Sequence, residues 1–228
     1  MEVVYEDNHI IIVNKRPGEI VQGDKTGDTP LVETVRQYIK ETYAKPGNVF
    51  CGLVHRIDRP VGGLVVFAKT SKALTRLNDM FRNNEIHKTY WAIVQGRPKQ
   101  PEAHLTHYIT SVERNNKSYA SLRPKEGAAR SELIYRTLAE GENYSLLEIN
   151  LITGRKHQIR VQLSTTGTPI KGDLKYGARR SNPDGSISLL ARSIRFVHPV
   201  SKKEIYVEAP VPDDKLWAAL TAAIDAEK

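Results

Sequence analysis

Four consecutive segments in the middle of the chain have the composition of β-strands, and this run constrains the fold more than any other feature. The segments are KTYWAIVQG (88–96), AHLTHYI (103–109), ARSELIYRTL (129–138) and YSLLEINLI (144–152). Their apolar residues alternate with polar ones or follow one another almost continuously. Regular βαβ alternation is missing, so several of these strands are expected to be antiparallel neighbours.

Helical patterns and further strands flank this run on both sides. Apolar residues recur at helical spacing in 31–43, 71–84, 155–167 and 212–228, and short strands are indicated at 3–15, 63–69, 188–198 and 204–210. Ser71 is expected to cap the second of these helices. The mixture predicts the α+β class, with a mixed, largely antiparallel central sheet flanked by helices and loops. No linker divides the chain convincingly, so a single domain over residues 1–228 is expected.

The charge balance favours a polyanionic partner. The chain has 34 Lys and Arg residues against 26 Asp and Glu, a formal net charge of +8, and an isoelectric point near 9.5. Nucleic acid is therefore the leading partner class, although many soluble proteins are moderately basic. Cys51 is the only cysteine, which excludes an internal disulfide and a cysteine-based zinc site. No long apolar window occurs, and a cytoplasmic, membrane-free protein is expected.

Signatures of metal, nucleotide and serine-hydrolase chemistry are missing. His104 and His107 are three residues apart in an alternating segment, so their side chains are expected to point to opposite faces. The chain has no HExxH motif, no phosphate-binding GxxxxGK loop, no GxGxxG fingerprint and no GxSxG elbow. We expect neither a structural nor a catalytic metal.

The stretch HRIDRPVGGLVVFAKT (55–70) holds Asp58 between Arg56 and Arg59, just before a glycine pair and an apolar run. A rigid loop of this kind can present a carboxylate to a cleft, and a cation within a few Å lowers a carboxylate pKa by roughly one to three units. An ionised, oriented carboxylate is a usable nucleophile or base. An ordinary Arg-Asp surface pair explains the same spacing, and the residues alone leave both interpretations open.

The stretch TGRKHQIR (153–160) is the second candidate. With Thr153-Gly154 as a turn, a helix is expected from Arg155 onward, and Arg155 and Lys156 at its start oppose the helix dipole unless an anion lies in front of them. A phosphate group would resolve this conflict. A solvated basic helix start is the alternative, and Arg160 is expected on roughly the opposite side of the helix from Arg155.

Taken in order, the chain resembles the RluA family of RNA pseudouridine synthases. YEDNHIIIVNKRPGEIV is similar to the family's amino-terminal strand pair and N-K-P-x-G entry, with Arg16 inserted. HRIDRPVGGL is similar to H-R-L-D-x-x-T-S-G-L, and KTYWAIVQG to K-x-Y-x-A-x-V-x-G. TGRKHQIRVQLSTTGTPIKGDLKYG is similar to the long T-G-R-x-H-Q-I-R block that ends in G-D-x-x-Y-G. Four long motifs in this order are highly specific.

The resemblance implies the pseudouridine synthase fold and the isomerisation of uridine to pseudouridine in RNA without a cofactor. It implies that Asp58 is the catalytic aspartate, that Tyr90 stacks on the target base and takes part in proton movement, and that Arg160 pairs with Asp58. Arg56 would occupy the RNA stack after the base has flipped out. The resemblance does not decide whether Asp58 attacks the sugar or removes its 2′ proton.

Departures from the family pattern affect the surroundings of these residues. Val61-Gly62 replace the usual Thr-Ser, which is expected to perturb loop packing more than chemistry. Gln162 replaces a histidine and Thr168 stands where G-H-P is frequent, so substrate contacts are expected to differ there.

Many relatives carry a small RNA-binding domain before the catalytic one, whereas this chain begins almost directly on the first strand. We therefore expect a compact stem-loop of ribosomal or transfer RNA as the substrate. The basic candidates for RNA contact are Arg56, Arg155, Lys156, Lys171, Arg179 and Arg180. A monomer is expected, because no uncovered apolar stripe stands out.

Two other functions compete with the synthase. A catalytically silent RNA-binding or ribosome-assembly protein of the same fold is the first, and the joint presence of Asp58, Tyr90 and Arg160 argues against it. A nucleic-acid hydrolase is the second, but the sequence has no evident acidic cluster for two metal ions.

Overall fold

The computed structural model describes residues 1–226 and divides the chain into two compact units. The first comprises residues 1–86 and 191–209, and the second comprises residues 87–190 and the segment from residue 210 onward. The single domain expected over residues 1–228 stays a prediction. Within residues 1–226, no helix is both long and apolar enough to cross a membrane.

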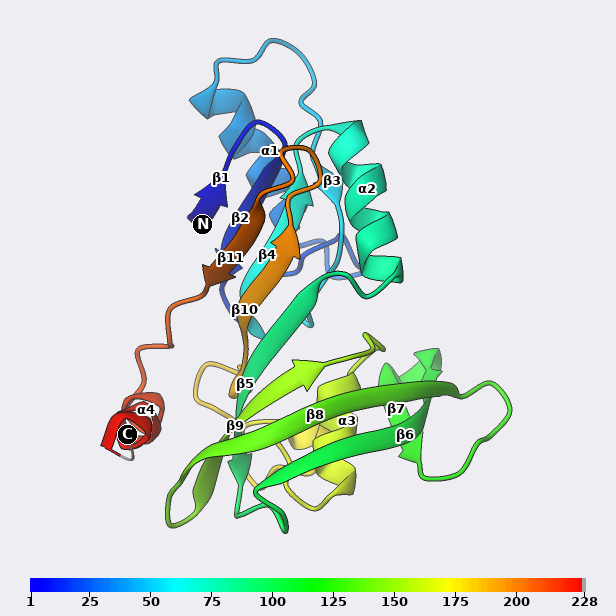
Figure 1. Cartoon of the computed structure of the whole chain (residues 1–228), viewed down its shortest axis with the longest axis vertical. Coiled ribbons are helices and arrows are strands. Elements are labelled where there is room, and N and C mark those ends of the chain that lie inside the picture. Colours follow the sequence, from blue (N-terminus) through cyan, green and yellow to red (C-terminus); the bar gives the residue numbers. More distant parts are fainter. Residues whose placement is uncertain (227–228) are drawn as a thin grey trace. The chain divides into compact units, whose positions relative to one another are not determined.

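The first unit is built on strands in the order β1-β2-β4-β10 (Figure 1). Its strands are β1 (Glu2–Glu6), β2 (Ile10–Lys15), β3 (Gly52–Leu53), β4 (Gly62–Ala68), most of β10 (Leu189–Val197) and β11 (Glu204–Glu208). β3 pairs antiparallel with β4, and β11 pairs antiparallel with β10. β2 and β4 also pair antiparallel, and both are buried along almost their whole length, which explains their near-continuous apolar sequences.

Two helices belong to the first unit, α1 (Leu31–Thr42) and α2 (Ser71–Arg82). The buried side of α1 consists of Leu31, Val35 and Ile39, as expected from the helical spacing. The cap of α2 differs from the prediction. Thr70 rather than Ser71 is the capping residue, because its side-chain oxygen accepts a hydrogen bond from the backbone N–H of Ala73 at 3.2 Å.

The second unit contains strands in the order β5-β9-β8-β6-β7 (Figure 1). They are β5 (His87–Gln95), β6 (Glu102–Val112), β7 (Lys117–Ser121), β8 (Ala129–Glu140) and β9 (Tyr144–Leu151). The helices are α3 (Gln158–Thr165) and α4 (Lys215–Ala226), with short 3-10 turns η1 (Glu113–Asn115) and η2 (Leu174–Tyr176). Neighbouring strands pair antiparallel throughout this order, which confirms the expectation from the mid-chain sequence.

Helix α3 begins three residues later than predicted. His157 adopts the left-handed conformation, with φ of 56°, and the backbone N–H of Gln158 donates to the Arg155 carbonyl at 3.1 Å. Arg155 and Lys156 therefore lie in a turn that precedes the helix, and the predicted conflict with the helix dipole does not arise at these positions. The helix ends at Thr165, two residues before Gly167.

Candidate active site

Asp58 lies in the first unit, on the loop between β3 and β4, and its side chain is half-buried. The Asp58 carbonyl accepts a hydrogen bond from the Val61 backbone N–H at 3.0 Å, which closes a tight turn. Gly63, the second residue of the glycine pair, has a structural reason to be glycine. Gly63 has φ of +112°, and a Cβ at this position would lie 2.4 Å from the Ala191 carbonyl oxygen. Only glycine permits this approach of β4 to β10 directly after the loop.

The buried side chain of Lys15 anchors the Asp58 loop through hydrogen bonds to backbone carbonyls. Its side chain is 1% exposed, and Nζ donates to the carbonyls of Glu19 at 2.8 Å, Arg16 at 3.0 Å and Arg59 at 3.1 Å. Burial lowers the pKa of Lys15 to about 8, while the negative charges of Glu19 and Asp58 oppose this shift. One ammonium group thus joins the NKRPG turn to the backbone next to Asp58.

The two arginines beside Asp58 have partners elsewhere in the first unit. Arg59 forms an ion pair with Asp28 and donates to the Thr26 hydroxyl at 3.1 Å. Arg56 is exposed and donates to the Gln22 side-chain oxygen at 3.3 Å. Lys15 is an additional cation that acts electrostatically on Asp58, and the sequence motifs did not indicate this role.

Arg160 lies on α3 in the second unit and is held by a buried carboxylate. Its Nε and Nη2 atoms donate to the two oxygens of Asp173 at 2.7 and 2.9 Å, and the exposed fractions of the two side chains are 6% and 1%. The guanidinium carbon also lies 5.0 Å from the centroid of the Tyr176 ring. This two-bond ion pair fixes both the position and the plane of the guanidinium.

Tyr176 joins Arg160 to the turn that precedes α3. Its hydroxyl accepts a hydrogen bond from the backbone N–H of Ser118 and contacts His157 Nδ1, both at 2.8 Å. The Ser118 hydroxyl donates to the Lys156 carbonyl at 2.7 Å. Burial raises the pKa of the Tyr176 hydroxyl. Asp173 and Tyr176 belong to the GDLKYG stretch, which was matched as a motif without a role for either residue.

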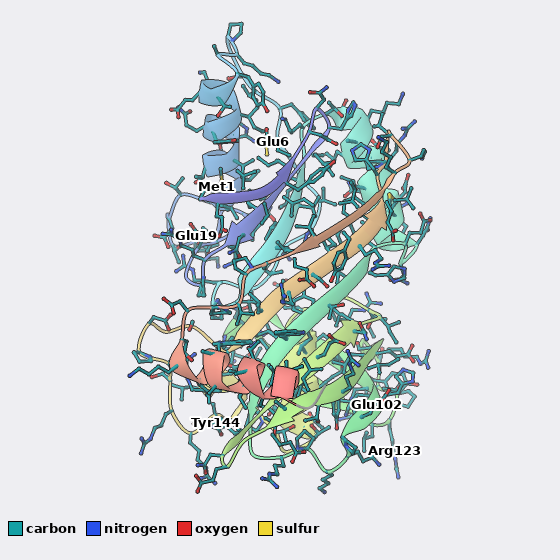
Figure 2. All side chains as sticks on the ribbon, turned by 60° about the vertical axis from the view of Figure 1, so that its left-hand side comes forward. Met1, Glu6, Glu19, Glu102, Arg123 and Tyr144 are labelled. Atoms are coloured by element: carbon teal, nitrogen blue, oxygen red, sulfur yellow. The ribbon has the colours of Figure 1, made fainter. Side chains whose placement is uncertain are left out.

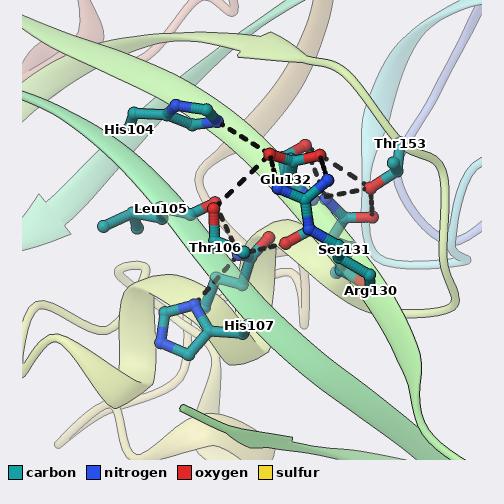
Figure 3. Close-up of polar contacts among 10 residues, drawn as sticks. His104, Leu105, Thr106, His107, Arg130, Ser131, Glu132 and Thr153 are labelled. Atoms are coloured by element: carbon teal, nitrogen blue, oxygen red, sulfur yellow. Dashed lines mark hydrogen bonds and ion pairs between the residues drawn. The ribbon is translucent and has the colours of Figure 1, made fainter. Parts of the chain in front are cut away.

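The other end of the TGRKHQIR turn is fixed on β8 (Figure 3). The Glu132 backbone N–H donates to the Thr153 hydroxyl at 2.8 Å, and the Gln158 side-chain amide donates to the Glu132 carbonyl at 3.0 Å. The Glu132 carboxylate pairs with Arg130 at 2.8 Å and with His104 at 3.2 Å. Thr153 and Gln158 thus position the turn through β8.

Gln162, one of the departures from the family pattern, is fully buried in the second unit. Its side-chain amide nitrogen contacts His107 Nδ1 at 3.0 Å, the Ser131 carbonyl at 3.2 Å and the Leu105 carbonyl at 3.3 Å. Gln162 therefore ties α3 to β6 and β8 through its side-chain nitrogen. His104 is exposed on β6 while His107 is buried, so the two side chains lie on opposite faces as predicted.

Tyr90 lies in β5, opposite Ile149 of β9, and its side chain is 8% exposed. Lys88, two residues earlier, projects from the same face of the strand, and burial lowers its pKa. A rigid strand position suits a residue that must hold its ring in one orientation.

The predicted RNA-contacting residues of the second unit have different surroundings. Arg155 and Lys156 are exposed. Lys171 is half-buried and donates to the Asn182 side-chain oxygen at 2.6 Å, so it stabilises the loop around residue 182. Arg179 and Arg180 are exposed and line a groove of about 840 Å³ together with Gln95, Asn143 and Tyr144, among others. Among residues 1–226, no group of three or more His, Cys, Asp and Glu side chains is arranged to hold a metal ion.

Comparisons of the sequence with known proteins find relatives among the pseudouridine synthases. The sequence pattern of the RNA pseudouridylate synthases matches residues 9–165. The ribosomal large subunit pseudouridine synthase C of Vibrio cholerae is 33% identical over 225 residues, covering 96% of this chain and 68% of that protein. The tRNA pseudouridine synthase C of Vibrio vulnificus is 32% identical over 241 residues, covering 96% of this chain and 94% of that protein.

A solved structure supports the fold. Human RNA pseudouridylate synthase domain containing 4 superimposes with a TM-score of 0.79 at 21% identity, covering 98% of this chain and 93% of that chain. The α+β fold class and the family resemblance found in the motifs are both confirmed. The chain therefore belongs to the RNA pseudouridylate synthase family, whose enzymes convert uridine in RNA to pseudouridine.

Proposed function

We propose that this chain isomerises specific uridines in ribosomal or transfer RNA, in the cytoplasm, as a monomer that needs neither a metal nor an organic cofactor. The observation that carries the proposal is Asp58 on a loop fixed by Lys15, within the motif shared with the family. Both RNA classes are proposed because similar relatives are named as synthases for the large ribosomal subunit and for tRNA.

In the proposed mechanism, the target base leaves the RNA stack before the chemistry begins. Flipping costs a few kcal/mol, which phosphate contacts and a side chain that fills the gap can offset. Arg56 is suited to fill the gap, because it is exposed on the Asp58 loop and is held by a long hydrogen bond of 3.3 Å to Gln22. Arg155, Lys156, Arg179 and Arg180 are exposed and supply positive charge for phosphates, whereas Lys171 contributes through the loop that it holds.

The chemistry requires an ionised carboxylate and a held base. The bond between N1 and C1′ breaks, the uracil turns, and C5 forms the new bond to C1′; the proton on C5 is released and N1 gains a proton. Positive charge that develops on the ribose is stabilised or captured by Asp58. Tyr90 stacks on the uracil and takes part in proton movement. Pairing of Arg160 with Asp58 stays a prediction, and the Asp173 ion pair fixes the orientation of the Arg160 guanidinium.

Tritium release tests this function. RNA labelled at C5 of uridine is prepared as unmodified ribosomal and transfer RNA and incubated with the wild-type protein in the presence of a chelator. We expect release of tritium to water from at least one RNA class, because the C5 proton is lost when the new bond forms. Binding of every RNA without any release would contradict the proposal and favour the silent RNA-binding alternative.

A further inference from the structure

Residues 113–128, which we term the β7 arm, have no part in the chemistry described above. The arm consists of η1, strand β7 and the loop that leads to β8. β7 is the last strand in the order of the second unit, and within residues 1–226 its one strand partner is β6. In Figure 1 the loop from β7 to β8 extends beyond the ends of these strands. β7 was not expected from the sequence, because KSYAS lacks an apolar alternation.

The base of the arm is fixed to the turn that precedes α3. The Ser118 backbone N–H donates to the Tyr176 hydroxyl at 2.8 Å, and the Ser118 hydroxyl donates to the Lys156 carbonyl at 2.7 Å. Lys175 Nζ donates to the Asn116 carbonyl at 2.9 Å. These contacts join the arm to residues on both sides of Arg160 in the sequence, so the arm has a defined position relative to that side chain.

Positive charge approaches Tyr176 from the arm as well as from α3. Lys117 Nζ lies 5.5 Å from the centroid of the Tyr176 ring, and the Arg160 guanidinium carbon lies 5.0 Å from the same centroid. Arg155 and Lys156 are exposed in the adjoining turn. An anionic ligand near Arg160 would therefore meet further cations in the direction of the arm.

The outer part of the arm combines basic and aromatic side chains. Four basic residues, Arg114, Lys117, Arg123 and Lys125, stand against two acidic residues, Glu113 and Glu126. Arg114, Arg123 and Lys125 are exposed, and Figure 2 shows Arg123 at the periphery of the second unit. Tyr119 is 47% exposed, with Lys117 Nζ 5.7 Å from its ring centroid and Asn115 donating to its hydroxyl at 2.8 Å.

This composition fits RNA better than another protein. Exposed aromatic rings stack on unpaired bases, and nearby Lys and Arg side chains bind phosphates. A peptide could instead pair with the outer edge of β7, but the charged Lys117 on this edge strand opposes such pairing. Leu122, which is 76% exposed, follows the strand and offers a further exposed apolar side chain.

We propose that the β7 arm is an RNA-contacting element. Its exposed Arg114, Arg123 and Lys125 bind backbone phosphates of the substrate, and Tyr119 stacks on an unpaired base outside the catalytic residues. This inference rests on the proposed function for the identity of the RNA, and it assigns the arm to binding and not to the isomerisation itself.

The electrostatic part is tested with matched triple variants. The arm variant carries Arg114→Ala, Arg123→Ala and Lys125→Ala; the control carries Lys99→Ala, Lys202→Ala and Lys203→Ala, which removes the same charge from exposed positions elsewhere. Affinity for unmodified RNA is measured over a salt series. We expect the arm variant to bind about tenfold more weakly at low salt and to lose up to about three from the salt slope, with the control within about twofold of wild type.

The stacking part is tested at Tyr119. Tyr119→Leu removes the aromatic face and Tyr119→Phe retains it. We expect about tenfold weaker binding for Tyr119→Leu and nearly unchanged binding for Tyr119→Phe, because one stacked base contributes on this scale. The rate of tritium release at saturating RNA is expected to stay within about twofold of wild type in the control that carries Lys99→Ala, Lys202→Ala and Lys203→Ala.

Arm and control variants with equal RNA affinity and equal salt slopes would overturn the proposal. So would an arm variant that differs from the control only in self-association, measured by sedimentation, since this would identify the arm as a contact between copies of the chain. Wild-type protein that binds RNA without turnover would contradict the proposed function alone, and the binding comparison would still decide the role of the arm.

Discussion

The Asp58 loop and the turn that leads into α3 each depend on a buried charged group, but the two groups act in different ways. Lys15 binds three backbone carbonyls and fixes the path of the main chain around Asp58. Asp173 binds the side chain of Arg160 through two hydrogen bonds and fixes a guanidinium directly. Lys15 thus positions a loop, whereas Asp173 positions the functional group of Arg160.

The largest effect on stability is expected in the second region. Asp173→Asn removes the charge that compensates buried Arg160, and breaking a buried ion pair from one side costs about 3 to 5 kcal/mol. Chemical denaturation measures this loss. Asp79→Asn, in the exposed pair with Arg82, is the control and is expected to cost less than about 0.5 kcal/mol. Equal losses in the two variants would remove the special role assigned to Asp173.

The stability contributed by the Lys15 anchor is expected to change as pH rises into the alkaline range. The ion pair that holds Arg160 is not expected to change over this range. The unfolded lysine titrates near 10.5 and the folded Lys15 at about 8, so the folded state releases this proton first as pH rises. Stability contributed by this site is therefore lowest below pH 8 and rises through the interval up to about pH 10.5, by at most ~3 kcal/mol. Arginine stays charged throughout this range.

Denaturation of wild type and Lys15→Met at several pH values measures the effect. The difference in unfolding free energy between them is expected to shift in favour of wild type as pH rises from about 8 to 10.5. The same comparison with Lys40→Met, at an exposed site on α1, is expected to show no such trend. A difference that stays constant for Lys15→Met, or shifts against wild type, would contradict the account of a buried, charged anchor.

The smallest effect is expected at Tyr176, whose ring centroid lies 5.0 Å from the guanidinium carbon of Arg160. Tyr176→Phe leaves the ring in place but removes the hydroxyl that binds Ser118 and His157, at a cost of about 1 to 2 kcal/mol. Tyr119→Phe, at an exposed hydroxyl, is expected to change thermal stability little. If Tyr176→Phe also changed thermal stability little, the hydroxyl contacts would have no part in fixing the turn.

The sequence predicted the elements with a clear periodicity, and the reason is local. The strand pair at the amino terminus, α1, the five-strand region from β5 to β9 except β7, and α4 all follow apolar spacing that their own residues display. The start of α3 was wrong, because His157 takes the left-handed conformation, which no periodicity reveals. β7 was missed for lack of an apolar pattern.

The candidate site was predictable only where a motif named the residue. Asp58 was a candidate from its place between two arginines, and the roles of Asp58, Tyr90 and Arg160 came from the family resemblance. Lys15, Asp173 and Tyr176 were left without roles. Their contacts join residues far apart in the chain, such as Lys15 with Arg59 and Tyr176 with Ser118. Tertiary packing creates these partners, so spacing along the sequence does not reveal them.

Tritium release by the Asp58→Asn variant measures whether the Asp58 carboxylate takes part in the isomerisation. Wild type, Asp58→Asn and the exposed control Asp79→Asn are compared on the same C5-labelled RNA with chelator present, together with RNA affinity and thermal stability. We expect release by wild type and by Asp79→Asn, and none by Asp58→Asn despite retained folding and RNA binding. Release by Asp58→Asn at the wild-type rate would contradict it, because the carboxylate of Asp58 would then have no part in the chemistry.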